Sequence, residues 1–257
     1  MVRRLTAIAV GAGVILTAPR AGAQAHSTFG ERGEIILSAD RLFPLFAYSH
    51  TSQDDLLPVG SPKETSTNNE ASISLLWGST QPVGENFYTV PRVGFDYVLF
   101  PHVTVGGDLI VFFTLGGSSS ASTTNAGVTT TNSNGNPSSL VFGLAPRGGY
   151  ILPLSDLFSL WLRGGFSYYV GSTKTTTGAG AGQTTNSGSV NQFGLDLDPQ
   201  IVFTPIPHLG VTAGLTADIP LTGGHSSDTD QGGVSTSQSA WSSIFFFGIT
   251  TGLIGYF

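Results

Sequence analysis

The last stretch of the chain, residues 241–257 (WSSIFFFGITTGLIGYF), alternates with a period of two. One face is mostly apolar and carries Phe245, Phe247 and Leu253, and it ends at Phe257. The other face carries small and polar residues such as Thr250 and Gly252, although Ile244, Phe246, Ile254 and Tyr256 interrupt it. This alternation predicts a β-strand with one side in lipid and the other side in the filled interior of a barrel.

The same periodicity recurs in seven further segments upstream. In the segment 87–99, Val93, Phe95 and Tyr97 alternate with Arg92, Gly94 and Asp96. Pro44 in the first segment predicts a bulge or a strand end. The predicted strands are 34–49, 87–99, 103–115, 139–151, 159–170, 190–204, 209–220 and 241–257.

The connections alternate between short turns and long polar segments. The turns are 100–102, 152–158 and 205–208, and the polar segments are 51–70, 116–138, 171–189 and 221–240, which we interpret as mobile outer loops. Residues 71–78 either extend the next strand or form a hairpin arm outside the membrane. Eight strands with short turns at one end and long loops at the other predict an all-β, closed antiparallel transmembrane β-barrel.

Composition agrees with a membrane barrel. Charged residues make up only 10% of the chain, which holds 35 glycines and no cysteine, whereas soluble domains are about 25% charged. Outside the leader, no apolar run reaches the ~18 residues of a membrane helix. The absence of cysteine excludes a disulfide scaffold and a thiolate metal site.

The first 25 residues have the features of a signal peptide. Arg3 and Arg4 precede the apolar run 5–18, and small residues at 21–23 and 23–25 offer two cleavage sites. We therefore predict a signal peptide at 1–25 and a barrel at 26–257. Removing Arg3, Arg4 and Arg20 would leave 7 basic against 16 acidic residues, a formal charge of −9 that argues against nucleic acid as a partner.

The end of the chain resembles the terminal assembly signal of bacterial outer-membrane barrels. Thr250, Gly252 and Phe257 match that pattern, whereas Gly255 departs from it. Together with the strand and loop pattern, the chain resembles small eight-stranded bacterial outer-membrane β-barrel proteins of the OmpA/OmpX-like architecture. The resemblance implies an outer-membrane location, contact with outer-membrane lipids, assembly by the insertion machinery and a role in envelope integrity or surface contact. We expect a monomer, with no cofactor and no periplasmic peptidoglycan-binding domain.

The inward face of the predicted strands carries an ionic cluster. Because an eight-stranded barrel is filled by side chains, these charges should be paired, and we predict Arg147 with Asp108 and Arg163 with Asp198. Asp96 should face Asp108, and Arg147 should face Arg163, across their turns. The predicted cluster consists of Asp40, Arg92, Asp96, Asp108, Arg147, Arg163, Asp196 and Asp198.

A faint repeat places a proline four residues before an aromatic residue in three strands. Phe95, Tyr150 and Phe203 follow Pro91, Pro146 and Pro199. Four is an even number, so proline and aromatic share the outer face, and the aromatics should form a lipid-facing girdle. Because proline removes a ladder hydrogen bond, we expect bulges or distorted pairing at these positions.

The ionic cluster is consistent with two functions, a structural filling of the lumen and a gate whose ion pairs exchange partners to pass small solutes. An enzyme acting on lipids is a further alternative. His225 with Ser226, Ser227, Asp228 and Asp230 resembles a Ser/His/Asp set or a weak calcium site, but we interpret this group as a solvated polar loop. We therefore expect a non-enzymatic envelope protein whose extracellular ligand is unknown, with a narrow pore as the alternative.

Overall fold

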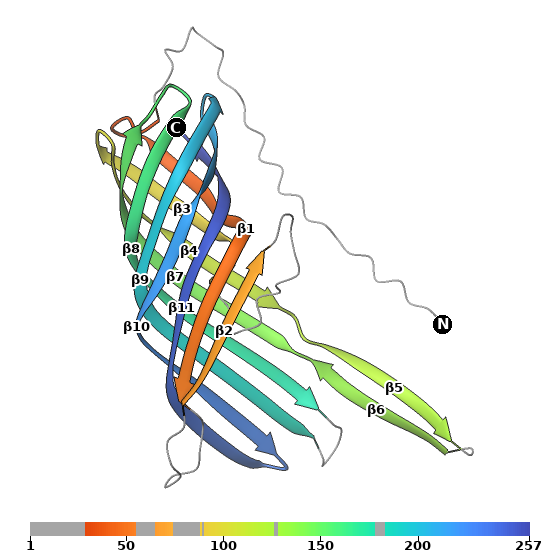
Figure 1. Cartoon of the computed structure of the whole chain (residues 1–257). Helices are drawn as coiled ribbons and strands as arrows, with labels where there is room; N and C mark the ends of the chain where they lie inside the picture. The colour runs from red at the N-terminus through yellow and green to blue at the C-terminus, as the bar shows by residue number, and fades with distance from the viewer. Residues whose placement is uncertain (1–28, 55–64, 74–87, 89, 126–127, 178–182) are drawn as a thin grey trace.

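The computed structural model describes residues 29–54, 65–73, 88, 90–125, 128–177 and 183–257. These residues form one antiparallel sheet, and eight of its strands close into a barrel (Figure 1). Around the ring the order is β3, β1, β11, β10, β9, β8, β7 and β4, which returns to β3. The strands are β1 (Ile35–Asp54), β2 (Thr65–Ile73), β3 (Arg92–Phe100), β4 (Val103–Thr114), β5 (Gly117–Asn125), β6 (Val128–Asn136), β7 (Ser138–Pro153), β8 (Phe158–Thr177), β9 (Thr184–Ile206), β10 (Leu209–Gln231) and β11 (Val234–Tyr256).

The first and last barrel strands close the ring, as the terminal alternation predicted. β1 pairs with β11 over most of its length. At the end of this seam, Ile35 N–H donates to the Phe257 carbonyl (2.9 Å), and Phe257 N–H donates to the Ile35 carbonyl (3.0 Å). The predicted fold class is therefore confirmed.

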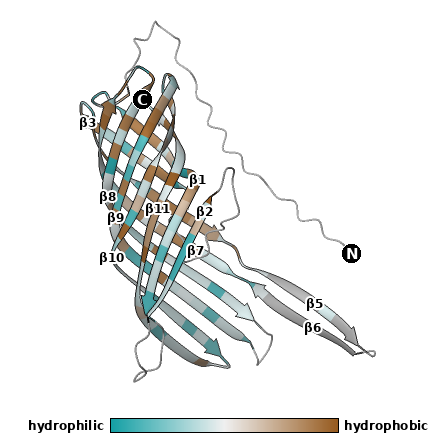
Figure 2. Ribbon diagram, viewed as in Figure 1, coloured by the Kyte–Doolittle hydropathy of each residue, from teal (hydrophilic) through white to brown (hydrophobic). Residues whose placement is uncertain are grey.

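Apart from the irregular part of β1, side chains alternate between the lumen and the outer surface in the membrane half of the barrel. In β3, Arg92 and Asp96 are buried, whereas Val93 and Phe95 are exposed. Hydrophobic residues are concentrated in the half of the barrel near the carboxyl end of the chain, and the strands become hydrophilic toward their opposite ends (Figure 2). An apolar outer belt around a polar interior is the arrangement that places a barrel in a bilayer.

Across the described residues, no helix is long and apolar enough to span a membrane.

The prediction that the four long polar segments are loops is wrong, because strands continue through most of their described residues. β8 runs to Thr177 and β9 starts at Thr184, while β5 and β6 form a separate hairpin that projects from the barrel (Figure 1). β10 and β11 meet at a two-residue turn, Gly232-Gly233, whose φ angles of 60° and 84° suit a tight hairpin. The threonine-rich sequence favours strands, and each extension prolongs a ladder that already exists inside the membrane.

The segment before β3 agrees with one of the two predicted alternatives where the structure describes it. Residues 71–73 end β2, which pairs with the outer half of β1, so this part is a hairpin arm. Residues 74–78 lie outside the described residues. β3 begins at Arg92, so the described residues Tyr88, Val90 and Pro91 of the predicted strand 87–99 precede it, and Phe87 lies outside the described residues.

The bulge predicted near Pro44 is present, and at Pro146 and Pro199 the other predicted alternative, distorted pairing, occurs without a bulge. β1 shifts its register against β11 between Ala39 and Phe43 and again between Pro44 and Phe46. Beside Pro146 and Pro199, the ladder to one neighbour skips two residues and resumes in the same register. Each of these prolines keeps a regular partner on its other side, which holds the register. Pro91 precedes β3.

Candidate functional site in the barrel lumen

Aromatic and aliphatic side chains fill the end of the lumen near the chain's first described residues. Phe29 enters this end, is 5% exposed, and packs edge-on against Trp161 (5.7 Å between ring centroids) and Tyr256 (5.3 Å). The other members of this buried cluster are Ile36, Val98, Ile151, Val202 and Ile254. We call this set the lower apolar layer.

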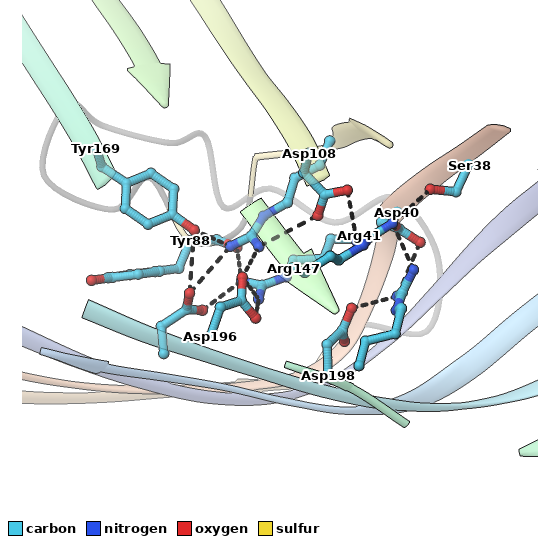
Figure 3. Close-up of polar contacts among 12 residues, drawn as sticks. Ser38, Asp40, Arg41, Tyr88, Asp108, Arg147, Tyr169, Asp196 and Asp198 are labelled. Atoms are coloured by element: carbon cyan, nitrogen blue, oxygen red, sulfur yellow. Dashed lines mark hydrogen bonds and ion pairs between the residues drawn. The ribbon is translucent and has the colours of Figure 1, made fainter. Parts of the chain in front are cut away.

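An ionic layer lies next in the lumen. It contains four arginines and six aspartates among the described residues, all of them buried, and Figure 3 shows most of their contacts. If all were ionised, the layer would carry a formal charge of −2. A buried charge is tolerated only when it is paired and hydrogen-bonded, which is the arrangement found here. The members are Asp40, Arg41, Arg92, Asp96, Asp108, Arg147, Arg163, Asp196, Asp198 and Asp218.

Arg147 contacts three carboxylates of this layer. Its guanidinium lies 2.6 Å from a carboxylate oxygen of Asp96, 2.6 Å from one of Asp108 and 3.0 Å from one of Asp40. Nη2 also donates to the hydroxyl of Ser38 (3.3 Å). The predicted pair of Arg147 with Asp108 is present, and two further carboxylates share the same cation.

Arg163 forms the predicted contact with Asp198 and a second one with Asp40. Its Nη1 and Nη2 donate to the two carboxylate oxygens of Asp40 at 3.0 and 3.2 Å, a bidentate pair. Nη2 also donates to Asp198. Asp40, which the sequence places in the cluster, therefore links Arg147 and Arg163.

Arg41 and Arg92 together hold two carboxylates that stand directly opposite each other. Asp218 of β10 pairs with Asp196 of β9 in the ladder, a like-charge pair that would be destabilising alone. Arg41 lies 2.6 Å from Asp218 and 3.3 Å from Asp196. Arg92 contacts the same two aspartates and the hydroxyl of Tyr169.

Inward glycines make room for these large side chains. Asp96 pairs with Gly106 and Asp108 with Gly94, while Arg147 and Arg163 pair with Gly165 and Gly149. The predicted direct opposition of Asp96 with Asp108, and of Arg147 with Arg163, is therefore wrong by two residues. A Cβ atom on Gly94 would lie 2.6 Å from Asp108 Oδ1 and 2.7 Å from Arg147 Nη2, so the glycine is required by the packing.

An outer aromatic layer covers the other side of the ionic layer. Tyr88 stacks on Phe246 (5.5 Å) and meets Tyr169 edge-on (5.1 Å). Gln192 Nε2 donates to the Ile244 carbonyl (2.8 Å), and Ile244 N–H donates back to Gln192 Oε1 (2.8 Å). Aromatic rings of the lower apolar layer and of the outer aromatic layer also form cation–π contacts. Arg163 lies over Trp161 (4.5 Å) and Arg41 over Phe246 (5.7 Å).

Four members of this lumen were missed by the sequence analysis. Asp218 has the inward parity of Thr212 and Thr216, so alternation alone would have identified it. Arg41 has the outward parity and faces inward only because of the bulge, where its φ is 55°. Tyr88 belongs to no barrel strand of the structure, and Tyr169 is predicted only as part of its strand.

The residues predicted to face lipid or to end the chain lie as follows. Phe95 and Tyr150 are exposed on the outer surface, and Phe203 stacks on Phe158 there (4.9 Å). Phe257 is 62% exposed and stacks on His208 (5.9 Å). Thr250 and Gly252 face the lumen. The predicted signal peptide at 1–25 lies outside the described residues.

The group around His225 does not converge into a catalytic or metal site. His225 and Ser227 share the inner face of β10, because this strand alternates, whereas Asp228 and Asp230 are exposed on the outer face. The two carboxylates therefore stand on the opposite side of the sheet from the imidazole. Within the described part of the chain, no cluster of three or more His, Asp or Glu residues could hold a metal ion.

The carboxyl group of Glu34, outside the membrane-spanning strands, has a strongly shifted pKa. Glu34 is buried just before β1, where its Oε2 accepts the N–H of Gly30 (2.7 Å). Burial, with a smaller contribution from Glu31, raises its pKa to about 7. This carboxyl group anchors the segment that carries Phe29 into the lumen.

The ring of eight strands, the apolar belt and the filled polar lumen define the class of this chain, a closed eight-stranded transmembrane β-barrel. No protein-family model matches the sequence, and no curated protein matches it.

Solved structures of outer-membrane barrels resemble the chain at low identity. They include the attachment invasion locus protein Ail of Yersinia pestis (10% identity, 86% of this chain and 99% of that chain covered, TM-score 0.30). They also include a major outer membrane protein of Thermus thermophilus (13%, 82% and 99%, 0.39) and the outer membrane protease OmpT of Escherichia coli (10%, 90% and 98%, 0.36). At such scores the likeness decides neither activity nor partners.

Proposed function

We propose that this chain is a closed outer-membrane barrel with a structural or surface-interaction role in the bacterial envelope, and that it is not an enzyme. The observation that carries the proposal is the filling of the lumen by three successive layers. Trp161, Arg92 and Tyr169, one from each layer, are 0–1% exposed. A barrel filled in this way is a rigid support for its surface strands, because the side chains of each layer contact one another across several strands.

The membrane partners follow from the outer surface. The apolar belt binds outer-membrane lipids, and the last strand presents Phe257 to the insertion machinery. Both termini of the barrel lie at the end opposite the polar strand extensions (Figure 1), so the extensions face the cell exterior. We infer a monomer, because closure of the ring leaves no barrel strand inside the belt without partners.

A narrow pore is the second candidate, favoured by the sharing of carboxylates in the ionic layer. Asp40 contacts both Arg147 and Arg163, and Asp196 contacts both Arg41 and Arg92. Exchange of partners would therefore require only small movements. Conduction would also require the two aromatic layers to open, which is why we rank this candidate second.

Conductance in planar lipid bilayers separates the two candidates. We expect the wild-type protein and the variants Arg147→Ala and Arg163→Ala to give no stable current steps, with a general porin measured in parallel as the positive control. Stable steps in the wild type that change in either variant would support the pore. A lipid-modifying activity would appear as altered envelope lipid that depends on His225, and we expect none.

A further inference from the structure

A cavity of about 320 Å³ lies between the inner faces of the outer strand extensions. Residues of β1, β8, β9, β10 and β11 line it, so strands of the barrel wall surround the cavity. The volume corresponds to roughly ten water molecules at their share of the liquid. We call this space the vestibule.

The outer aromatic layer closes the vestibule from below. Ile244 and Val190 belong both to the lining of the vestibule and to the buried cluster around Tyr88. Tyr88 OH donates to the Ile244 carbonyl (3.1 Å), and Gln192 Nε2 donates to the same carbonyl. The vestibule is therefore a cup that a solute can enter from outside, and it is not the mouth of a channel.

Neutral hydrogen-bonding groups dominate the chemistry of the cup. No described lining residue is Lys or Arg, and the lining carries a single carboxylate, Asp54, and a single imidazole, His225. A hydroxyl group both donates and accepts, so this lining suits a ligand of the same kind and offers little to an anion or a bare cation. The hydroxyls on the inner face belong to Thr51, Thr173, Ser227 and Ser242, whereas those of Ser189 and Ser226 lie on the other face and bond each other (2.8 Å).

His225 supplies a second, independent observation. Its Nδ1 atom is buried and has no hydrogen-bond partner among the described residues. A buried polar atom normally has a partner, and an unpaired one costs free energy. A hydroxyl group bound in the vestibule would recover this cost once the imidazole ring turns the atom toward the cavity. We propose that the vestibule binds a neutral sugar, either free or as the terminal unit of a glycan, with His225 as a principal hydrogen-bonding residue. This inference rests on the proposed function, because it requires the cup to face the cell exterior.

The test uses the full-length protein in detergent micelles and calorimetric titration with D-glucose, D-galactose, N-acetyl-D-glucosamine and maltose. N-acetylneuraminate is the anionic comparison. We expect at least one neutral sugar to bind, and N-acetylneuraminate to bind more weakly. A column that carries the same sugar at the non-reducing end of an immobilised oligosaccharide distinguishes the two ligands. Retention of the protein on this column indicates a glycan terminus, and no retention indicates a free sugar.

Two neighbouring residues provide a matched pair of variants. Ser242 faces the vestibule and Ser243 faces outward, so Ser242→Phe should abolish binding, whereas Ser243→Phe should leave it unchanged. His225→Ala should weaken binding by about threefold to tenfold, the effect of one neutral hydrogen bond. Equal binding by the wild type and Ser242→Phe, or no binding of any of the four sugars by the wild type, would overturn the proposal.

Labelling of the Gly232→Cys variant in intact cells separates this outcome from failure of the proposed function. Labelling by a membrane-impermeant reagent together with absent sugar binding would refute only the sugar site. If the reagent labels position 232 only after the cells are broken, the outward orientation is refuted, and with it the surface role.

Discussion

Replacement of Arg147 by methionine tests the ionic layer most directly. The substitution keeps an unbranched apolar stem and removes the guanidinium that contacts Asp40, Asp96 and Asp108. Asp40 keeps Arg163 as a partner, and Asp108 keeps a longer contact to Arg92 (3.8 Å). Asp96 has no other cation within ion-pair distance among the described residues, so it bears most of the loss.

The expected cost follows from the burial of both partners. The side chains of Arg147 and Asp96 are 5% and 0% exposed, and removal of one member of such a pair costs about 3–5 kcal/mol. Urea unfolding in micelles, followed by tryptophan fluorescence, measures this loss. Arg32 lies exposed in the turn before β1, so Arg32→Met is the matched control and should change stability by less than about 0.5 kcal/mol.

A second substitution shows whether the loss comes from charge or from packing. Asp96→Asn in the Arg147→Met background removes the carboxylate that was left without a cation, and about 1–3 kcal/mol should be recovered. The interpretation is refuted if Arg147→Met unfolds at the same urea concentration as Arg32→Met, or if the added Asp96→Asn lowers stability further.

Three further predictions concern other parts of the barrel. Because the pKa of Glu34 is raised to about 7, the folded state keeps a proton that the unfolded chain releases above its ordinary pKa, so stability should fall as pH rises from about 4.5 to 7. The loss is at most about 3 kcal/mol, reduced by solvent at the rim, and Glu34→Gln should abolish it in urea titrations at pH 5 and 8. Gly94→Ala should destabilise by about 1–3 kcal/mol through overpacking, whereas Gly148→Ala, whose Cβ would meet nothing closer than 3.8 Å, should be nearly neutral in the same assay. Deletion of Phe257 should lower the amount of protein in the outer-membrane fraction, because the last rung of the β1–β11 seam and the stack on His208 are lost; unchanged amounts would count against this assembly role.

The eight strands could be predicted because lipid outside and packed side chains inside impose a period of two on every strand. Val93, Phe95 and Tyr97 face outward and Arg92 and Asp96 inward, as alternation requires. The extent of the strands could not be predicted in this way. Beyond the membrane both faces of a strand contact water, so the polar sequences around Thr173 and Thr185 do not alternate between apolar and polar residues. Only the pairing of neighbouring strands reveals that β8 and β9 continue there.

The ionic layer was predictable as far as strand parity and depth determine it. Arg163 and Asp198 are paired across neighbouring strands, and the sequence was sufficient to find them. Contacts across the lumen, such as Arg92 with Asp218, depend on the diameter of the barrel and on side-chain length. The two-residue error in depth for Asp96 and Asp108 comes from the register that the turn between β3 and β4 imposes, which places Asp96 opposite Gly106 and Asp108 opposite Gly94.

The bulge in β1 explains why the layer is balanced as well as it is. With regular alternation Arg41 would point into the lipid belt, at a cost of up to about 2–4 kcal/mol near the middle of the membrane. The lumen would then hold three arginines against six aspartates, and the opposed carboxylates of Asp196 and Asp218 would share Arg92 alone. By inserting residues between Ala39 and Phe43, the chain turns Arg41 inward, where it contacts both carboxylates and stacks on Phe246. The irregularity is thus a condition for filling the lumen with charge, since a strand of strict period two cannot direct both Asp40 and Arg41 to the same side.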